Sequence, residues 1–312
     1  MASIIRKTIS HIRAHTPLYL RIKIGPLFAY ITYVYRVYFS NNSLNFKVLS
    51  SEKTIDLIKD NSLSVIRFGD GELSFIENID LAFQKKNAEL ATKLKEIITS
   101  NHSGLLICVP GIFGKLNHFA KHSYWFSLHH LFKHGETWEK LLSKEYTYGD
   151  AFITRPYLTY SEAYRAKSGI IFDKLFSIWK DKEVVLIEGD KSRLGVGNNM
   201  FDQVQSIGRI LCPAENAYDR YDEIKKEALK IDKNKLVLLS LGPTAKVLAY
   251  DLFLLGYRVI DIGHIDMEYE MFLRKASKLE KVSYKYFNEI NERNPDECDD
   301  PKYQSQIIAQ IK

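Results

Sequence analysis

KLVLLSLGPTAKVLAYDLFLLGYRVIDIG, residues 235–263, contains the pattern that decides the fold. The apolar run Lys235–Leu241 predicts a buried strand, which a Gly-Pro pair ends. Pro243 suits the first turn of a helix over Thr244–Leu255, because the N–H that proline lacks has no helical partner there. A second apolar run, Arg258–Ile262, predicts another strand. A strand, a helix and a strand in this order form a βαβ unit with two parallel strands.

The same alternation continues outward from this unit. Strands are predicted at Ser64–Phe68, Gly104–Val109, Gly149–Thr154, Glu183–Glu188 and Arg209–Cys212, and helices at Thr54–Asp60, Asn87–Thr99, Arg165–Asp181, Tyr221–Leu229 and within 115–145. The pattern predicts an α/β fold with a Rossmann-like, mainly parallel sheet and flanking helices. Ligands of such sheets bind beyond the carboxyl ends of the strands, so polar residues at those ends are the candidates for a site.

Two changes of composition divide the chain. The polar run Asn41-Asn42-Ser43 follows a basic segment, and the residues from Glu289 onward are again polar. We therefore predict a basic N-terminal arm over residues 1–48, a main domain over 49–285 and a loosely held tail over 286–312.

The positive charge of the chain belongs to the arm. The whole chain has 44 basic and 38 acidic residues, but residues 1–51 hold seven basic residues and no acidic one. The rest of the chain is close to neutral, which argues against nucleic acid as a partner. Three widely spaced cysteines, Cys108, Cys212 and Cys298, indicate ordinary thiols in a reducing cytoplasm and no zinc site.

Two interpretations of the arm remain open. Its longest charge-free stretch after Lys23, Ile24–Tyr35, is too short to span a bilayer, and no cleavage site typical of a signal peptide follows an apolar core. Basic residues between apolar and aromatic ones fit helices on the inner face of an anionic membrane. They equally fit helices that pack on the main domain with their basic side chains reaching water.

An acidic pair follows the strand at residues 64–68, in the run Arg67-Phe68-Gly69-Asp70-Gly71-Glu72. Two carboxylates one residue apart on a glycine-rich backbone can bind one divalent cation. With Arg67 beside them, Asp70 and Glu72 predict a site for a metal ion and a diphosphate. The alternative is an ordinary Asp-Gly turn.

A glycine-rich run, EGDKSRLGVGNN at residues 188–199, follows another strand. Lys191 and Arg193 supply positive charge, and Gly195 and Gly197 allow a ligand to approach the backbone. We expect this run to open a helix whose N-terminus binds phosphate. The alternative is a plain glycine-rich loop.

Two shorter segments are weaker candidates. Thr244 follows a strand and a Gly-Pro turn, where its hydroxyl could bind an anion or simply belong to the turn and its cap. Arg155 and Tyr157 follow a predicted strand and could bind a diphosphate and a base, or lie in a surface loop.

His264, Asp266, Glu268 and Glu270 alternate with apolar residues. In an extended chain all four would face one side and could bind a metal or supply a general base. If a helix starts near Asp266 instead, that residue is its N-cap, and the two glutamates complement the helix dipole.

Together these segments resemble the bacterial GT-D type glycosyltransferases, which contain domain of unknown function 1792. The matching stretches are RFGDGE (67–72), TRPY (154–157), EGDKSRLGVGNNMF (188–201), RILCPAENAYDRYDEI (209–224) and LGPTAKVLAYDLFLLGYRVIDIGHIDMEYE (241–270). The resemblance covers about residues 50–275 and implies a Rossmann-like fold of the GT-D type. It also implies transfer of a hexose from a nucleotide sugar, usually a UDP-sugar.

The resemblance assigns roles to particular residues. It implies a manganese or magnesium ion on Asp70 and Glu72. It places Arg67, Lys191, Ser192, Arg193 and Asn198 around the donor and His264, Asp266 and Glu270 near the reacting carbon. Where the family pattern has Asn-Asp, this chain has Asn198-Asn199, which removes a charge.

The predicted function is therefore metal-dependent transfer of a hexose, from UDP-glucose or UDP-galactose, to a glycan acceptor of a surface polysaccharide or glycoprotein. Glu270 is the expected base, with Asp266 second and His264 orienting it. Two alternatives stay open, a metal-dependent phosphohydrolase or sugar-phosphate enzyme and a non-catalytic nucleotide-sugar-binding protein.

Overall fold

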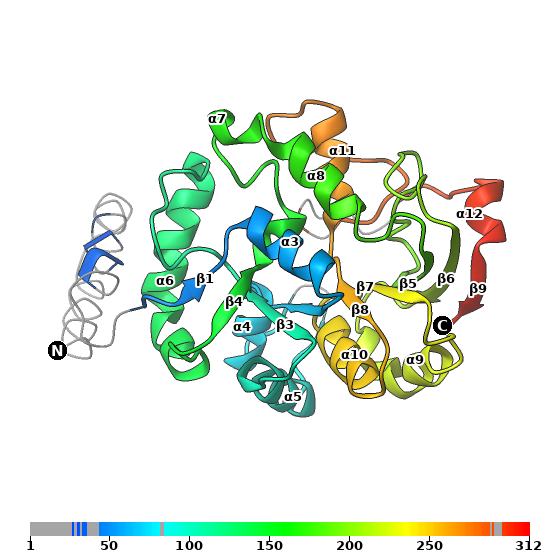
Figure 1. The fold of residues 1–312 in the computed structure, drawn as a ribbon, viewed down its shortest axis with the longest axis horizontal. Helices are drawn as coiled ribbons and strands as arrows, with labels where there is room; N and C mark the ends of the chain where they lie inside the picture. Colours follow the sequence, from blue (N-terminus) through cyan, green and yellow to red (C-terminus); the bar gives the residue numbers. More distant parts are fainter. Residues whose placement is uncertain are drawn as a thin grey trace.

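A nine-stranded sheet runs through the centre of the protein (Figure 1). The structure is a computed structural model that describes residues 44–81, 84–287, 289 and 295–312, with 27, 30–31 and 33–35 of the arm. In spatial order the strands are β1 (Lys47–Val48), β4 (Thr147–Asp150), β3 (Leu105–Val109), β2 (Ser64–Arg67), β8 (Val259–Asp261), β7 (Leu236–Ser240), β5 (Glu183–Gly189), β6 (Ser206–Cys212) and β9 (Ile307–Gln310). Their pairings are parallel, which confirms the predicted fold class.

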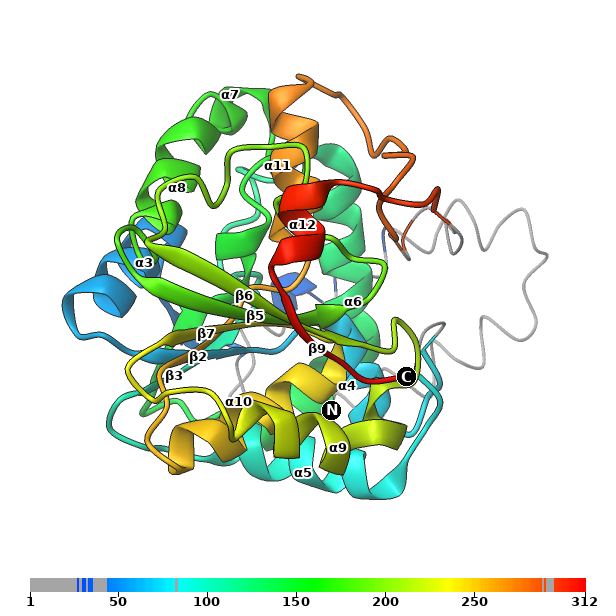
Figure 2. The same cartoon turned by 90° about the vertical axis from the view of Figure 1, so that its right-hand side faces the viewer.

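Helices cover both faces of the sheet (Figure 2). One face carries α3 (Ser51–Asp60), α7 (Glu162–Arg165), α8 (Ser168–Phe176) and α11 (Ile265–Leu273), and the other carries α4 (Asp70–Ile76), α5 (Ala88–Thr99), α9 (Tyr221–Ala228) and α10 (Pro243–Leu254). The long helix α6 (Lys121–Leu141) contacts α4 and α5, and α12 (Pro301–Ser305) precedes β9. The described part of the chain also contains two short 3-10 helices, Ala151–Thr154 and Ala217–Arg220.

The central strands are mostly apolar because both faces of the sheet are buried. Val65 and Ile66 of β2 are adjacent, yet Val65 belongs to the core cluster that includes residues of α3 and α8, while Ile66 belongs to the cluster that includes residues of α5 and α10. Leu238 and Leu239 of β7 divide between the two faces in the same way. Successive strand residues point to opposite faces, so a sheet covered on both sides favours apolar residues at successive positions.

The tail is part of this sheet, so the prediction of a loosely held terminal segment is wrong. Strand β9 pairs with β6, which contains the buried cation Arg209. Arg209 forms an ion pair with Glu188 and donates through Nε to Gln306 of the tail at 2.8 Å, and it lies 4.9 Å from the ring centre of Tyr303. The tail thus supplies partners that a buried guanidinium requires.

Three local predictions also need correction. The run after β5 opens no helix, since residues 190–204 form turns. The strand expected over Gly149–Thr154 ends at Asp150 and continues as a 3-10 helix, and the helix expected over Arg165–Asp181 is divided between α7 and α8.

Most of the N-terminal arm lies outside the described residues. The structure therefore does not decide between a membrane-bound arm and an arm packed on the main domain. Tyr33 is described; it is buried, and its hydroxyl donates a hydrogen bond to the carbonyl of Gly114. Among the helices of the described part of the chain, none combines the length and apolar character needed to cross a membrane.

Helix α6 contains a buried histidine that makes stability depend on pH. Nε1–H of Trp138 donates to Nε2 of His130 at 2.9 Å, and burial, with the nearby His134, His129 and Lys133, lowers the pKa of His130 to about 3. Between pH 6.5 and about 3 the unfolded chain binds a proton here that the folded chain does not, so stability falls as the pH falls.

We expect His130→Gln to remove this dependence, because the glutamine oxygen can accept the same hydrogen bond without titrating. From pH 7 to pH 5 the wild type should lose about 2 kcal/mol more free energy of unfolding than the variant. Urea unfolding of both proteins at the two pH values measures this difference, and equal losses would contradict the assignment.

The adjacent strands β2 and β8 create the place for a site. After β2 the chain leaves into α4 on one face, and after β8 it leaves into α11 on the other (Figure 2). In open parallel sheets, a ligand crevice forms where the connections of neighbouring strands diverge to opposite faces.

Candidate active site

The acidic pair lies on the first turn of α4, directly beyond β2. Gly69 is the N-cap residue, and its N–H donates to Glu72 Oε2 at 2.8 Å. Glu72 is thereby fixed and buried, whereas Asp70 is exposed at the start of the helix. The pair therefore sits on a helix N-terminus and not on the open turn that the Asp-Gly sequence also allowed.

A buried ionic network supports the pair from below. Nζ of Lys246, on α10, lies 2.9 Å from Glu72 Oε1 and 3.1 Å from Asp261 Oδ2 at the end of β8. Arg67 Nη2 lies 3.2 Å from Asp261 Oδ1, and Arg67 Nη1 donates to the Thr154 hydroxyl at 2.6 Å. Burial alone would raise the pKa of Asp261, but Arg67 and Lys246 hold it below its ordinary value.

Arg67 is thus held by protein groups on all sides. Gly263 has a φ of +47°, and a Cβ atom there would come within 2.1 Å of Arg67 Nη2. The glycine after β8 therefore makes room for the guanidinium, which fixes Arg67 as a support of the site.

Asp70 has a different environment. Desolvation raises the pKa of its carboxyl group, repulsion from Glu72 raises it further, and Arg155 lowers it. Within the described residues no side chain forms a hydrogen bond or ion pair with this carboxylate. Arg155 itself is paired with Glu289, with Nη1 3.2 Å from Oε2.

The two carboxylates fit a divalent cation shared with a ligand. Within the described chain no three His, Cys, Asp or Glu side chains gather as a complete metal site. Magnesium-type ions are commonly held by one or two carboxylates and completed by substrate phosphates, and a cation would relieve the repulsion that raises the pKa of Asp70.

His264 is the N-cap residue of α11 and faces the same end of the sheet. Burial lowers its pKa to about 4, an effect that Glu289 opposes and Arg155 and Arg67 reinforce. The imidazole is therefore neutral at pH 7, and its ring packs edge-on against Phe287 at 5.4 Å.

Asp266 and Glu270 belong to a second, buried cluster on α11. Lys285 Nζ lies 2.6 Å from Asp266 Oδ2 and 3.0 Å from Glu270 Oε1, and its side chain is 0% exposed. The amide of Asn198 donates to both carboxylates at 2.8 Å, and Gly195 N–H donates to Asp266 at 2.9 Å. The helical interpretation of this segment is therefore right, although the N-cap is His264 and not Asp266.

The glycine-rich loop is held by protein contacts more than the sequence suggests. Arg193 donates to the carbonyls of Tyr284 and Asp296, and Ser192 is buried. Gly195 and Gly197 have φ values of +75° and +78°, and Cβ atoms there would meet Phe201 and Tyr284. Their close approach is thus to aromatic side chains of the chain itself.

We expect Gly195→Ala to lower the free energy of unfolding by about 3 kcal/mol, since the left-handed backbone is strained and the new Cβ would lie 2.4 Å from the Phe201 ring. Gly256→Ala is the matched control, with a φ of +87° but nothing within 4 Å of the Cβ position. It should cost only about 1–2 kcal/mol. Denaturant unfolding gives both values, and equal costs would refute the packing role of Phe201.

The remaining predicted residues occupy varied places. Thr244 is fully buried, and its hydroxyl oxygen has no hydrogen-bond partner in the described chain, so a ligand could reach it only if neighbouring atoms move. Tyr157 packs in the core against Phe272. Asn199 accepts a hydrogen bond from the Tyr269 hydroxyl at 2.7 Å, a contact that either amide or carboxylate oxygen can make.

Sequence reasoning missed three charged residues of the two clusters, Lys246, Asp261 and Lys285, and also Glu289, the partner of Arg155. A signal existed for the first two, since Lys246 interrupts an apolar helix and Asp261 an apolar strand. A buried charge in such a run requires a partner.

Comparisons with known proteins agree on one family. The family model described as "Glycosyltransferase GT-D fold" matches residues 65–290. A probable glycosyl transferase Gly of Streptococcus gordonii is 39% identical over 266 residues, which cover 85% of this chain and 39% of that protein. The glycosyltransferase GlyD of Streptococcus pneumoniae serotype 4 is 36% identical over 267 residues, 85% of this chain and 32% of that protein. The chain thus spans 39% and 32% of the length of these two relatives.

Two solved structures superpose on this chain over nearly their full length. A domain of unknown function 1792 described as having a distinct glycosyltransferase fold superposes with a TM-score of 0.84 at 34% identity, covering 90% of this chain and 99% of that one. A domain described as a new glycosyltransferase (DUF1792) from Streptococcus sanguinis gives 0.81 at 38% identity, covering 86% and 100%. The matched region contains both charged clusters, and on this evidence the chain belongs to the family of glycosyltransferases with the GT-D fold.

Proposed function

We propose that the chain is a metal-dependent glycosyltransferase that moves a hexose from a nucleotide sugar, UDP-glucose or UDP-galactose, to a glycan acceptor of a surface polysaccharide or glycoprotein. The observation that carries the proposal is the carboxylate of Asp70, an exposed residue, beside the fixed carboxylate of Glu72, at the point where the connections that follow β2 and β8 diverge to opposite faces. Family membership supports sugar transfer as the reaction class.

Asp70 and Glu72 would hold manganese or magnesium. Bound there, the ion would neutralise the charge that develops on a departing nucleoside diphosphate. Lys246 keeps Glu72 in place, and Arg155 sets positive charge beside Asp70. Arg155 is 35% exposed, so its guanidinium can also meet a phosphate in the crevice.

Asp266 and Glu270 were expected to act as bases. Both accept hydrogen bonds from Lys285 and Asn198, so proton abstraction by either would require these contacts to open. We propose a positioning role for them instead, in which they fix the loop around Gly195 and Asn198 against α11. His264, neutral at pH 7, can orient a substrate hydroxyl by hydrogen bonding.

A thermal-shift titration with UDP, with and without manganese, tests the proposal. A ligand that binds only the folded state stabilises it by RT ln(1 + [L]/Kd), about 2.7 kcal/mol at 100 times Kd. We expect a rise in Tm of several degrees that needs both UDP and manganese. No shift with both present would count against a metal–diphosphate site.

A further inference from the structure

Two large apolar side chains stand on the outer side of α6. Trp125 is 40% exposed and Phe126 is 57% exposed, and the exposed residues Lys121 and His122 come one turn earlier. The opposite side of the helix is buried in the core, with Trp138 as its largest residue. A helix that packs by one side is expected to be polar on the other, so adjacent exposed aromatic rings mark an interaction surface.

The described residues of the arm add to this surface. Leu27, Tyr30 and Ile31 are 57%, 44% and 52% exposed, and their spacing of three and four positions puts them on one face of a helix. The hydrogen bond from buried Tyr33 to Gly114 ties the arm to the loop between β3 and α6. In Figure 1 the described arm residues, drawn in blue, and α6 lie at the same end of the molecule.

Tyr124 connects the two parts. Its ring packs edge-on against Trp125, with ring centres 5.3 Å apart. Burial raises the pKa of the Tyr124 hydroxyl, and the nearby Tyr30 raises it further. The arm residues therefore adjoin the outer side of α6. We call the apolar side chains of both parts the end surface: Leu27, Tyr30, Ile31, Trp125 and Phe126.

The two segments that build the end surface contain no acidic residue. Residues 1–51 and 97–135 hold ten lysines and arginines and none of the 38 acidic residues of the chain. At the average of the chain, these ninety residues would contain about eleven acidic ones. The acidic residues of α6, Glu136 and Glu139, come in the second half of the helix. The end surface thus lies in a region whose formal charges are all positive.

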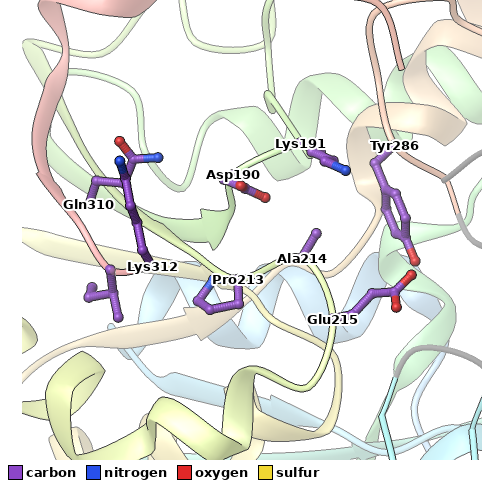
Figure 3. A pocket seen from close by; sticks show the side chains of 9 residues that line it. Asp190, Lys191, Pro213, Ala214, Glu215, Tyr286, Gln310 and Lys312 are labelled. Carbon is purple, nitrogen blue, oxygen red and sulfur yellow. The ribbon is translucent and has the colours of Figure 1, made fainter. Parts of the chain in front are cut away.

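The recess at the ends of β5 and β6 has a different character (Figure 3). Its lining combines Asp190 and Glu215 with Lys191 and Lys312, so carboxylates and ammonium groups are mixed and no single ligand charge is favoured. The end surface instead has cations beside a group of apolar side chains. It selects a partner by charge and by apolar contact together.

An anionic lipid bilayer fits this combination. Apolar side chains on the outside of a helix enter the headgroup region, Trp and Tyr favour the interface, and basic residues attract anionic lipids. The exposed cations beside Trp125 include Lys115 and Lys121. Lysine is depleted at protein interfaces, whereas at a membrane its long side chain can reach the phosphates. The surface therefore suits a bilayer better than a protein partner.

We propose that the end surface docks the protein on an anionic lipid bilayer, with Trp125 and Phe126 in the headgroup region and Lys115 and Lys121 beside the lipid phosphates. The proposal goes beyond the proposed function and does not depend on it. Helix α6 contacts α4, whose first turn carries Asp70. A docked protein therefore holds its acidic pair on the helix next to the docked one.

Trp125 gives a direct readout of docking, because the other two tryptophans, Trp138 and Trp179, are 0% exposed. The full chain is mixed with vesicles of phosphatidylcholine and phosphatidylglycerol whose acyl chains carry bromine, which quenches tryptophan on contact. We expect quenching by these vesicles and none by brominated phosphatidylcholine alone. Trp125→Phe should still bind the anionic vesicles but lose the quenching.

Cosedimentation with the same vesicles measures affinity, and the melting temperature verifies the fold of each variant. Trp125→Ser combined with Phe126→Ser should weaken binding about 10-fold or more. Lys115→Gln and Lys121→Gln should each weaken it about 5-fold, and added salt should reduce that difference. Leu254→Ser, at a residue 54% exposed on α10, is the matched control and should bind as the wild type does.

Three results would overturn the assignment: the wild type does not bind anionic vesicles, the Trp125 and Phe126 double variant binds as well as the wild type, or the wild type binds without quenching. The last result would assign membrane binding to other residues. A dimer in gel filtration that only the double variant disrupts, without vesicle binding, would assign the end surface to a second copy of the chain.

Discussion

Lys285→Met is expected to destabilise the protein by about 3–5 kcal/mol, because it leaves two buried carboxylates without their cation. The side chains of Asp266 and Glu270 are 1% and 6% exposed, and Lys285 lies within 3.0 Å of both. Burial alone would lower the pKa of Lys285, but the two carboxylates raise it above its ordinary value. Urea unfolding at pH 7 measures the loss.

Two further variants isolate the cause. Lys235→Met removes a cation from an exposed pair with Glu183 and should change stability by less than about 1 kcal/mol. Adding Asp266→Asn and Glu270→Gln to Lys285→Met should recover part of the loss, because no uncompensated charge then remains buried. A Lys285→Met protein within about 1 kcal/mol of the wild type would show that the cluster does not hold the loop.

Asp70→Asn is expected to lower sugar transfer by at least about 100-fold while the fold survives. The carboxylate is exposed and makes no hydrogen bond or ion pair with another described side chain, so the loss of its charge affects the helix N-terminus by no more than about 1 kcal/mol. The manganese-dependent stabilisation by UDP should disappear with the activity. Steady-state kinetics and thermal shifts measure the two effects.

Asp56→Asn, an exposed carboxylate on α3, is the matched control and should retain both properties. Full transfer activity in Asp70→Asn would rule out the metal role of this residue. A variant that fails to fold would instead show that Asp70 is structural, and circular dichroism separates these cases.

The sheet could be predicted from the sequence because its strands are buried on both faces. Residues 236–239 of β7 are apolar at every position and turn residues follow the strand, so strand type and parallel pairing follow from local pattern. Strand β9 offered no such signal, since its residues alternate between half-buried and exposed. It pairs with β6 and meets the buried Arg209 only through tertiary contacts that the local sequence does not reveal.

The conformation of the site segments was harder to predict. In α11, the alternation of polar and apolar residues fits a strand, yet Ile265–Met271 forms a helix buried on every side, so no amphipathic period exists to reveal it. The glycines at 195 and 197 indicated a ligand loop, but the space left by their missing side chains is occupied by Phe201 and Tyr284. The local sequence shows that glycine gives the backbone conformational freedom, but it does not show which group, a ligand or a side chain of the protein, lies against the glycine.

The candidate metal ligands were found because a strand end and an acidic pair are adjacent in sequence. The groups that hold these ligands in place could not be found in the same way. Lys246 follows Glu72 by 174 positions, and its ammonium group meets Glu72 and Asp261 only when α10 packs beside α4 and β8. Single lysines within apolar segments are the signal to look for in such chains, because a buried ammonium group requires an acidic partner.

The most direct measurement of the central claim is the release of UDP from UDP-glucose and UDP-galactose by the wild-type protein, with manganese and with a chelator. The account predicts UDP release from at least one donor with manganese present, with the hexose recovered on water or an added glycan, and none with the chelator. Folded protein that releases no UDP from either donor in manganese would contradict it.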